Sequence, residues 1–113
     1  MSQDVRRNLS LIQAYNQLPP KAQKIVLQCA GPSLTKGLCE IVYNTLTGRI
    51  PLSPKQHTKI KRDKKLKTRL RSLGFQKNLS LRKKRNLLVQ SGGFFSAILP
   101  IAASVLGAIL SSK

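Results

Sequence analysis

Acidic side chains are nearly absent from this sequence. Three Asp and Glu residues stand against 21 Lys and Arg among 113 residues, which leaves a formal net charge of +18. A compact chain with so much charge of one sign repels itself unless a polyanion or counterions screen it. The composition therefore predicts a polyanionic partner, and both nucleic acid and an anionic membrane fit this description.

Groups that carry out acid-base or metal chemistry are also scarce. The sequence has one histidine, His57, two cysteines, Cys29 and Cys39, and no nucleophile with a plausible base beside it. We therefore expect a protein that is not an enzyme and has no catalytic residues. The cysteines are separated by nine residues and do not match a zinc-ligand spacing, so we expect neither a metal site nor a cofactor.

Aromatic residues make up only 4% of the sequence, and tryptophan is missing. Phe75 is the only aromatic residue within the basic segment, which we define as residues 51–91. Side chains that stack on unpaired bases are therefore lacking there. No zinc-finger, RRM or bZIP pattern is present either. These absences favour binding to the backbone of double-stranded DNA, without sequence specificity.

Helical periodicity is what the N-terminal part of the sequence does contain. Apolar residues recur there at intervals of three and four, which is typical of helices that bury one face. Pro19-Pro20 is suited to begin a helix, Ser33 to cap the next, and Gly48 to end it. Helices are predicted over 4–17, 20–30 and 33–47.

The predicted fold class is all-α, with a small N-terminal bundle over residues 1–50, a long basic helix and a C-terminal apolar helix. About a dozen apolar side chains give the bundle a core that is marginal for its size. Two interpretations stay open for these side chains. They form a core of their own, which we favour, or they form a surface that a second copy or a capsid protein completes.

The basic segment holds most of the positive charge, with Asp63 as its only acid. Ser53 is suited to cap a helix over 54–73 that ends at Gly74, and Ser80 can cap a further helical stretch. Lysines and arginines three and four residues apart oppose an isolated helix, so we expect this segment to be partly disordered in the free protein. The residues predicted to bind nucleic acid are Lys55, Lys59, Lys61, Arg62, Lys64, Lys65, Lys67, Arg69, Arg71, Lys77, Arg82, Lys83, Lys84 and Arg85.

An uncharged apolar stretch of 17 residues, 94–110, follows the basic segment and forms most of the tail, residues 92–113. It is at the lower edge of the length that spans a bilayer, and Pro100 and Gly107 would bend or loosen a helix. In order of preference, it is a membrane-interacting peptide, a self-association segment or a transmembrane anchor. The residues predicted to contact a membrane are Phe94, Phe95, Ile98, Leu99, Ile101, Val105, Leu106, Ile109 and Leu110.

Short motifs in this sequence resemble those of viral and mobile-element core proteins. A basic cluster at 83–85, Gly92-Gly93 and an apolar stretch to Leu110 occur in the same order in the adenovirus core protein precursor pX, also called pre-mu. The overall layout is similar to small basic proteins of Polinton (Maverick) elements and adintoviruses, with Pro-Leu-Ser-Pro at 51–54 and Leu-Leu-Val-Gln-Ser-Gly-Gly-Phe at 87–94.

This resemblance implies a core protein that condenses double-stranded DNA in the host nucleus and in the virion core. It also implies contacts with capsid proteins, and cleavage by a viral cysteine protease after Gly93. From the residues alone, we favour the end of a helix followed by a hinge at Gly92-Gly93, and the resemblance makes the two interpretations about equal. The alternative function is a membrane-active protein whose tail inserts into the bilayer while the basic segment binds anionic lipid.

Overall fold

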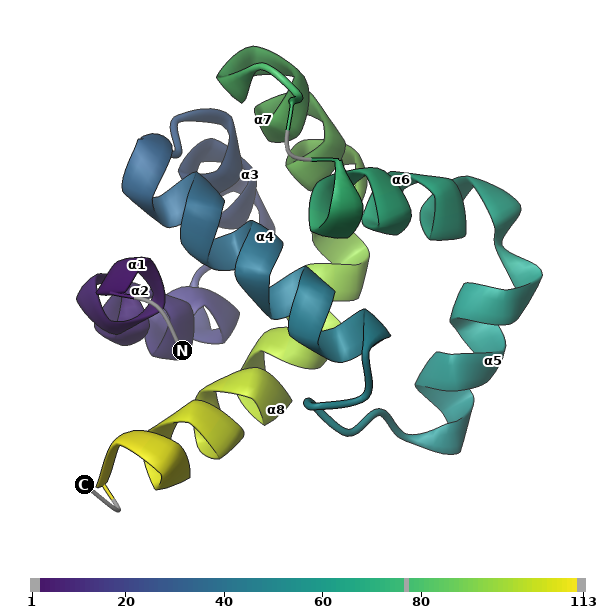
Figure 1. Cartoon of the computed structure of the whole chain (residues 1–113). Helices are drawn as coiled ribbons and strands as arrows, with labels where there is room; N and C mark the ends of the chain where they lie inside the picture. Colours follow the sequence, from purple (N-terminus) through teal and green to yellow (C-terminus); the bar gives the residue numbers. More distant parts are fainter. Residues whose placement is uncertain (1–2, 77, 112–113) are drawn as a thin grey trace.

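The computed structural model describes residues 3–76 and 78–111, and this part of the chain is helical without strands (Figure 1). The all-α class predicted from the sequence is confirmed. The elements are, in chain order, α1 (Gln3–Arg7), α2 (Leu9–Ala14), the 3-10 helix η1 (Tyr15–Gln17), α3 (Pro20–Gln28), α4 (Pro32–Leu46), α5 (Pro54–Arg62), α6 (Lys64–Phe75), α7 (Leu81–Gln90) and α8 (Gly92–Ser111).

Local start and stop signals explain several helix boundaries. The helices α3, α4 and α5 each begin with a proline, whose fixed φ suits the first turn and whose missing N–H would have no partner there. Gly48 has a φ of 84° just beyond α4, a left-handed conformation that glycine adopts without a steric penalty. The predicted roles of Pro20 and Gly48 are therefore confirmed.

Residues 4–17, predicted as one helix, are divided at Asn8. Its side-chain Nδ2 donates to the backbone oxygen of Asp4 at 2.7 Å and to Ser33 Oγ at 3.1 Å. Ser33 in turn donates to Asp4 Oδ1 at 3.0 Å. The prediction that Ser33 caps α4 was wrong, because Gly31 occupies the N-cap position and the Ser33 hydroxyl joins α4 to α1 instead.

The prediction of a single long basic helix over 54–73 was also wrong. The chain leaves helical geometry at Asp63 (φ −93°, ψ 93°), and Asp63 Oδ1 accepts a hydrogen bond from the backbone N–H of Leu66 at 3.0 Å. Asp63 therefore ends α5 and caps α6. Gly74 does not stop α6, which continues through it; a Cβ at this position would lie 3.3 Å from Leu46 Cδ1 and 3.4 Å from Tyr43 Cα.

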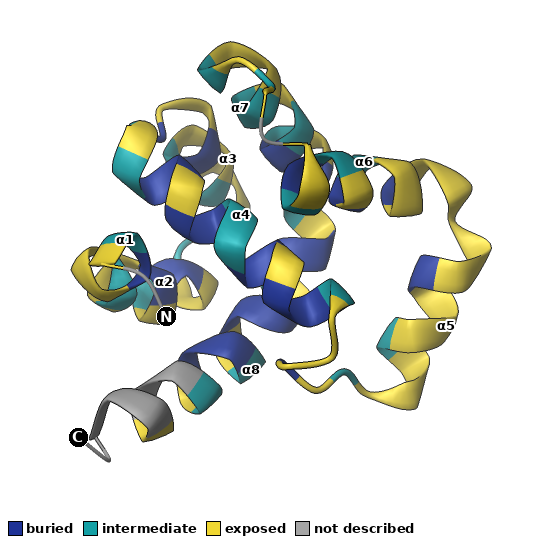
Figure 2. Ribbon diagram, viewed as in Figure 1, coloured by how far each residue is buried: buried dark blue, intermediate teal, exposed yellow. Residues whose placement is uncertain are grey.

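One hydrophobic core joins the three segments distinguished in the sequence. The helix α4 packs between α1 and α6, α3 packs against α7, and α8 lies against α2 and η1 (Figure 1). The basic segment and the tail thus complete the core of the N-terminal bundle, so the three segments are not separate units (Figure 2). Core side chains include Val5, Leu27, Ile41 and Val42 from the bundle, Leu66, Leu70, Leu73 and Leu88 from the basic segment, and Phe94, Phe95, Ile98 and Leu99 from the tail.

Candidate nucleic-acid interface

The basic residues of α6 occupy the side of the helix opposite its core contacts. Leu66, Leu70 and Leu73 are buried at intervals of four and three residues, which places them on one face. Lys64, Lys65, Lys67 and Arg71 of the same helix are exposed, whereas Arg69 is half-buried. The segment therefore supplies the core with one face and a cationic surface with the other.

The helix α5 extends the same charged surface away from the body of the protein (Figures 1 and 2). Ser53 caps this helix as predicted, in a capping box where Gln56 N donates to Ser53 Oγ at 3.2 Å and Ser53 N donates to Gln56 Oε1 at 3.0 Å. Gln56 Nε2 also donates to the backbone oxygen of Ala97 in α8 at 3.2 Å. Ile60 is the buried side chain of α5, and the charged residues around it are exposed.

Ser80 begins the third helix of the basic segment as predicted, since its Oγ accepts from Lys83 N at 3.2 Å. The first turn of α7 adds two exposed cations to those of α5 and α6. We call the exposed residues of this set the basic surface. Its members are Lys55, Lys59, Lys61, Arg62, Lys64, Lys65, Lys67, Arg71, Arg82 and Lys83.

Asp63 lies within the basic surface, between α5 and α6. The hollow at this junction is lined by Asp63 and four cationic side chains, Lys59, Arg62, Lys64 and Lys65. The carboxylate is held at the N-terminus of α6 by its cap hydrogen bond. It places one negative charge where the surrounding side chains would attract an anion.

Two arginines predicted to bind nucleic acid have structural contacts instead of full exposure. Arg69 Nε donates to Ser91 Oγ at 3.3 Å, which ties α6 to the junction between α7 and α8. Arg85 Nε donates to the backbone oxygen of Ala30, which ties α7 to the segment after α3. Both arginine side chains are half-buried. They hold the basic helices in place.

The remaining two predicted residues differ from the basic surface in another way. Lys84 is half-buried beside Cys39. Burial raises the pKa of the Cys39 thiol, and the positive charge of Lys84 opposes this effect to a smaller extent. Lys77 lies outside the described residues.

The Gly92-Gly93 pair lies in the first turn of α8. Ser91 is the C-cap of α7, and the chain bends by 89° between α7 and α8 at this residue. Gly93 is exposed, whereas Gly92 is half-buried, with room for a Cβ at 3.7 Å from Leu27 Cδ1. The pair is thus helical in this structure, and Ser91 rather than the glycines forms the corner.

The residues predicted to contact a membrane are divided between the core and the surface of α8. Phe94, Phe95, Ile98 and Leu99 are buried in the core, while Ile101 and Val105 are half-buried. The side chains of Leu106, Ile109 and Leu110 lie outside the described residues. In the described part of the chain, no single helix has the length and apolarity to cross a membrane; α7 and α8 meet the criterion only as a pair bent by 89°.

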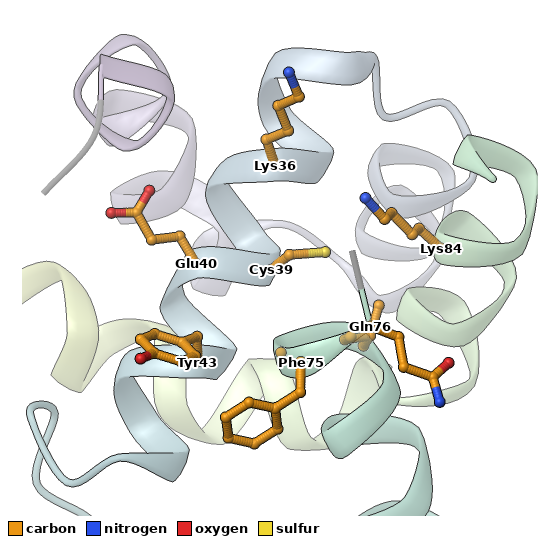
Figure 3. A pocket seen from close by; sticks show the side chains of 9 residues that line it. Lys36, Cys39, Glu40, Tyr43, Phe75, Gln76 and Lys84 are labelled. Carbon is orange, nitrogen blue, oxygen red and sulfur yellow. The ribbon is translucent and has the colours of Figure 1, made fainter. Parts of the chain in front are cut away.

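Sequence reasoning missed one aromatic contact near the basic surface. Tyr43 of α4 lies against Phe75 at the end of α6, with ring centroids 5.5 Å apart and an interplanar angle of 74° (Figure 3). A signal was present, because Lys36, Cys39 and Tyr43 follow one another at helical spacing on α4. Only the packing of α6 on α4 brings Phe75 to that stripe.

Comparisons of the chain with protein-family models, with curated proteins and with solved structures found no match. Among the described residues, no three His, Cys, Asp or Glu side chains form a group that could hold a metal ion.

Proposed function

We propose that this protein binds double-stranded DNA through the phosphate backbone, without sequence preference, and condenses it by neutralising its charge. The observation that carries this proposal is the basic surface, made of exposed lysines and arginines of α5, α6 and α7, with Asp63 as the one acid among the α5 and α6 cations. Cations that meet phosphates release condensed counterions, and this release drives binding to any duplex sequence.

The size of the protein suits the charge of the DNA that it would cover. Its longest dimension is 37 Å. Duplex DNA carries one negative charge per about 1.7 Å, so a stretch of this length has roughly 20 phosphate charges. The formal charge of +18 is close to that number. One protein molecule per such stretch would bring the complex near neutrality, which lets duplexes approach one another.

The resemblance to viral and mobile-element core proteins suggests that the protein packages DNA. Such a protein would act in the host nucleus and in the virion core, with the DNA and capsid proteins as partners. Nothing in this role requires catalysis. It requires many weak, exchangeable phosphate contacts, which long lysine and arginine side chains supply.

The salt dependence of binding tests the proposal. Affinity for two duplexes of unrelated sequence would be measured by fluorescence anisotropy at several salt concentrations. Six to ten phosphate contacts give a slope of about −5 to −9 in a plot of log affinity against log salt, and it should be equal for both duplexes. A slope near zero would contradict phosphate binding, and a strong preference for one duplex would contradict the lack of specificity.

Condensation needs a separate measurement. Light scattering of long duplex DNA should rise sharply as the protein approaches charge equivalence and should fall again when salt is added. A protein that binds without any increase in scattering is a DNA-binding protein that does not condense DNA, and the packaging part of the proposal would then fail.

A further inference from the structure

A groove of about 660 Å³ lies between α4, the end of α6 and α7 (Figure 3). Its volume falls within the range of about 300–1,000 Å³ that small-molecule sites occupy. The residues that line it are Lys36, Cys39, Glu40, Tyr43, Leu73, Gly74, Phe75, Gln76 and Lys84.

The groove contains two exposed aromatic side chains in a chain that buries its other aromatic residues. Tyr43 is 39% exposed and Phe75 is 51% exposed, although they lie far apart in the sequence. The edge-to-face contact between them holds both rings at the surface. Exposed, fixed rings of this kind are the groups on which nucleic-acid bases stack. The buried aromatic residues are Tyr15, Phe94 and Phe95.

Gly74 is what allows the two rings to meet. A Cβ on this residue would lie 3.4 Å from the Tyr43 backbone and 3.3 Å from Leu46, so a larger residue would push the end of α6 away from α4. The close approach of the two helices therefore sets the position of Phe75 relative to Tyr43.

Positive charge borders the aromatic pair. Lys36 projects from α4, and Lys84 reaches from α7 toward Cys39 (Figure 3). The carboxylate of Glu40 points away from Lys84 in the same view. A phosphate attached to a flat aromatic group would meet the cations and the rings of this groove together, whereas an apolar peptide would meet only the rings.

We propose that the groove binds an unpaired nucleotide, with its base stacked on Phe75, the edge of that base against Tyr43, and its phosphate held by Lys36 and Lys84. This inference rests on the proposed function, because neighbouring phosphates of the same strand would reach the basic surface through Arg82 and Lys83 of α7. The protein would then hold single-stranded stretches or frayed ends as well as duplex.

The first experiment compares two single strands with the same number of phosphates. One probe is a thymidine decamer, and the other is a decamer of abasic deoxyribose phosphates. The intact protein should prefer the thymidine decamer by a factor on the order of 5 to 150, which corresponds to stacking of about one base. Phe75→Ala should bring the two affinities together while duplex affinity stays unchanged. The matched control is Ile25→Ala, which removes a side chain that is 56% exposed on α3, outside the groove.

The two cysteines provide a readout in the unmodified protein. Cys39 lines the groove and Cys29 is exposed elsewhere, so the thymidine decamer should slow alkylation of Cys39 and leave Cys29 unaffected. The abasic decamer should protect Cys39 less. A Phe75→Trp variant keeps an aromatic ring, so it should retain the preference, and its tryptophan fluorescence should be quenched by the thymidine decamer.

The outcomes separate this inference from the proposed function. Equal affinity for both decamers with a steep salt dependence would overturn the groove site and leave phosphate binding intact. A preference that Phe75→Ala does not alter would also overturn it, because the bases would then be held elsewhere. Absence of binding to any nucleic acid would overturn both. If circular dichroism shows that Phe75→Ala is unfolded, the alkylation pattern of the unmodified protein and the binding preference of Phe75→Trp test the groove site instead.

Discussion

Neighbouring cations in α7 lie in different environments, although they form one cluster in the sequence. Lys83 is exposed, whereas Arg85 is half-buried and donates to the backbone oxygen of Ala30. Thr35 Oγ1 donates to the same oxygen at a longer distance of 3.4 Å. Arg85 therefore links α7 to the segment after α3, whereas the Lys83 side chain is exposed to solvent.

This difference predicts that one substitution affects stability and the other affects DNA binding. Arg85→Gln should lower the free energy of unfolding by about 1 kcal/mol, because a charged donor to a buried carbonyl is lost. Lys83→Gln should leave stability within about 0.5 kcal/mol and should reduce the magnitude of the salt slope for DNA by about 1. Urea unfolding and anisotropy titrations measure the two effects. Equal stability of the variants would show that the Arg85 contact contributes nothing.

Asp63 is the second residue with a testable double role, since it caps α6 and opposes anion binding. Asn is about as good an N-cap, so Asp63→Asn should keep the fold. Removing the negative charge should raise DNA affinity by a factor of about 5, which corresponds to roughly 1 kcal/mol for one charge at close range. Unchanged affinity would mean that the bound phosphates lie far from the α5–α6 junction. Asp63→Ala is the companion variant, and it should lose stability as well because the cap is absent.

Helix contacts determine where glycine is required. A Cβ at Gly37 would lie 3.3 Å from the backbone oxygen of Asp4, at the packing of α1 on α4, whereas Gly93 has nothing within 4 Å. Gly37→Ala should therefore destabilise the protein by about 1–3 kcal/mol. Gly93→Ala should stabilise it by roughly 0.5–1 kcal/mol, because alanine favours the helix. Thermal unfolding of the two variants checks the sign of each change.

Element boundaries were predictable where the signal is local. Ser53 and Ser80 bind backbone groups three residues away, and such caps are visible in the sequence. The break at Asp63 was missed because neither glycine nor proline marks it. The apolar spacing did contain a hint, since Ile60 and Leu66 are six residues apart and do not share a helical face.

The candidate site likewise has features that local sequence predicts and features that it does not. Exposed lysines of α5 and α6 could be identified from charge and periodicity alone, because they lie opposite the few apolar positions. The anchoring of Arg85 to Ala30 spans 55 residues, and the Tyr43–Phe75 pair depends on how α6 packs on α4. Contacts between residues so far apart depend on tertiary packing, which sequence periodicity does not specify.

At the scale of the whole molecule, α8 belongs to the core that the other helices share. A chain that ends at Gly93 would lose Phe94, Phe95, Ile98 and Leu99 from that core. We expect such a chain to lose its cooperative thermal transition while it keeps salt-dependent DNA binding, because the basic surface requires charge more than fixed geometry. Circular dichroism melting and anisotropy measure the two properties. A sharp transition in the truncated chain would contradict the shared core.

The burial of α8 in the core also allows a test of membrane activity. Because Phe94 and Phe95 of α8 lie in the core, the folded protein should adsorb to anionic vesicles through the basic surface and should be released by added salt. Insertion of α8 would instead give binding that resists salt and leakage of a dye from the vesicles. Neutral vesicles are the control, and they should bind little protein.

The two-sided character of α6 and α7 has a further consequence for the amount of protein that stays folded. The same helices carry core leucines on one side and mutually repelling cations on the other. A polyanion that binds the cations reduces their repulsion and thereby stabilises the packing of the leucines in the core. A ligand at 100 times its dissociation constant stabilises a fold by about 2.7 kcal/mol. Chains in excess of the available polyanion would be the first to open and to be digested by proteases. The supply of nucleic acid would thereby limit how much of the protein accumulates.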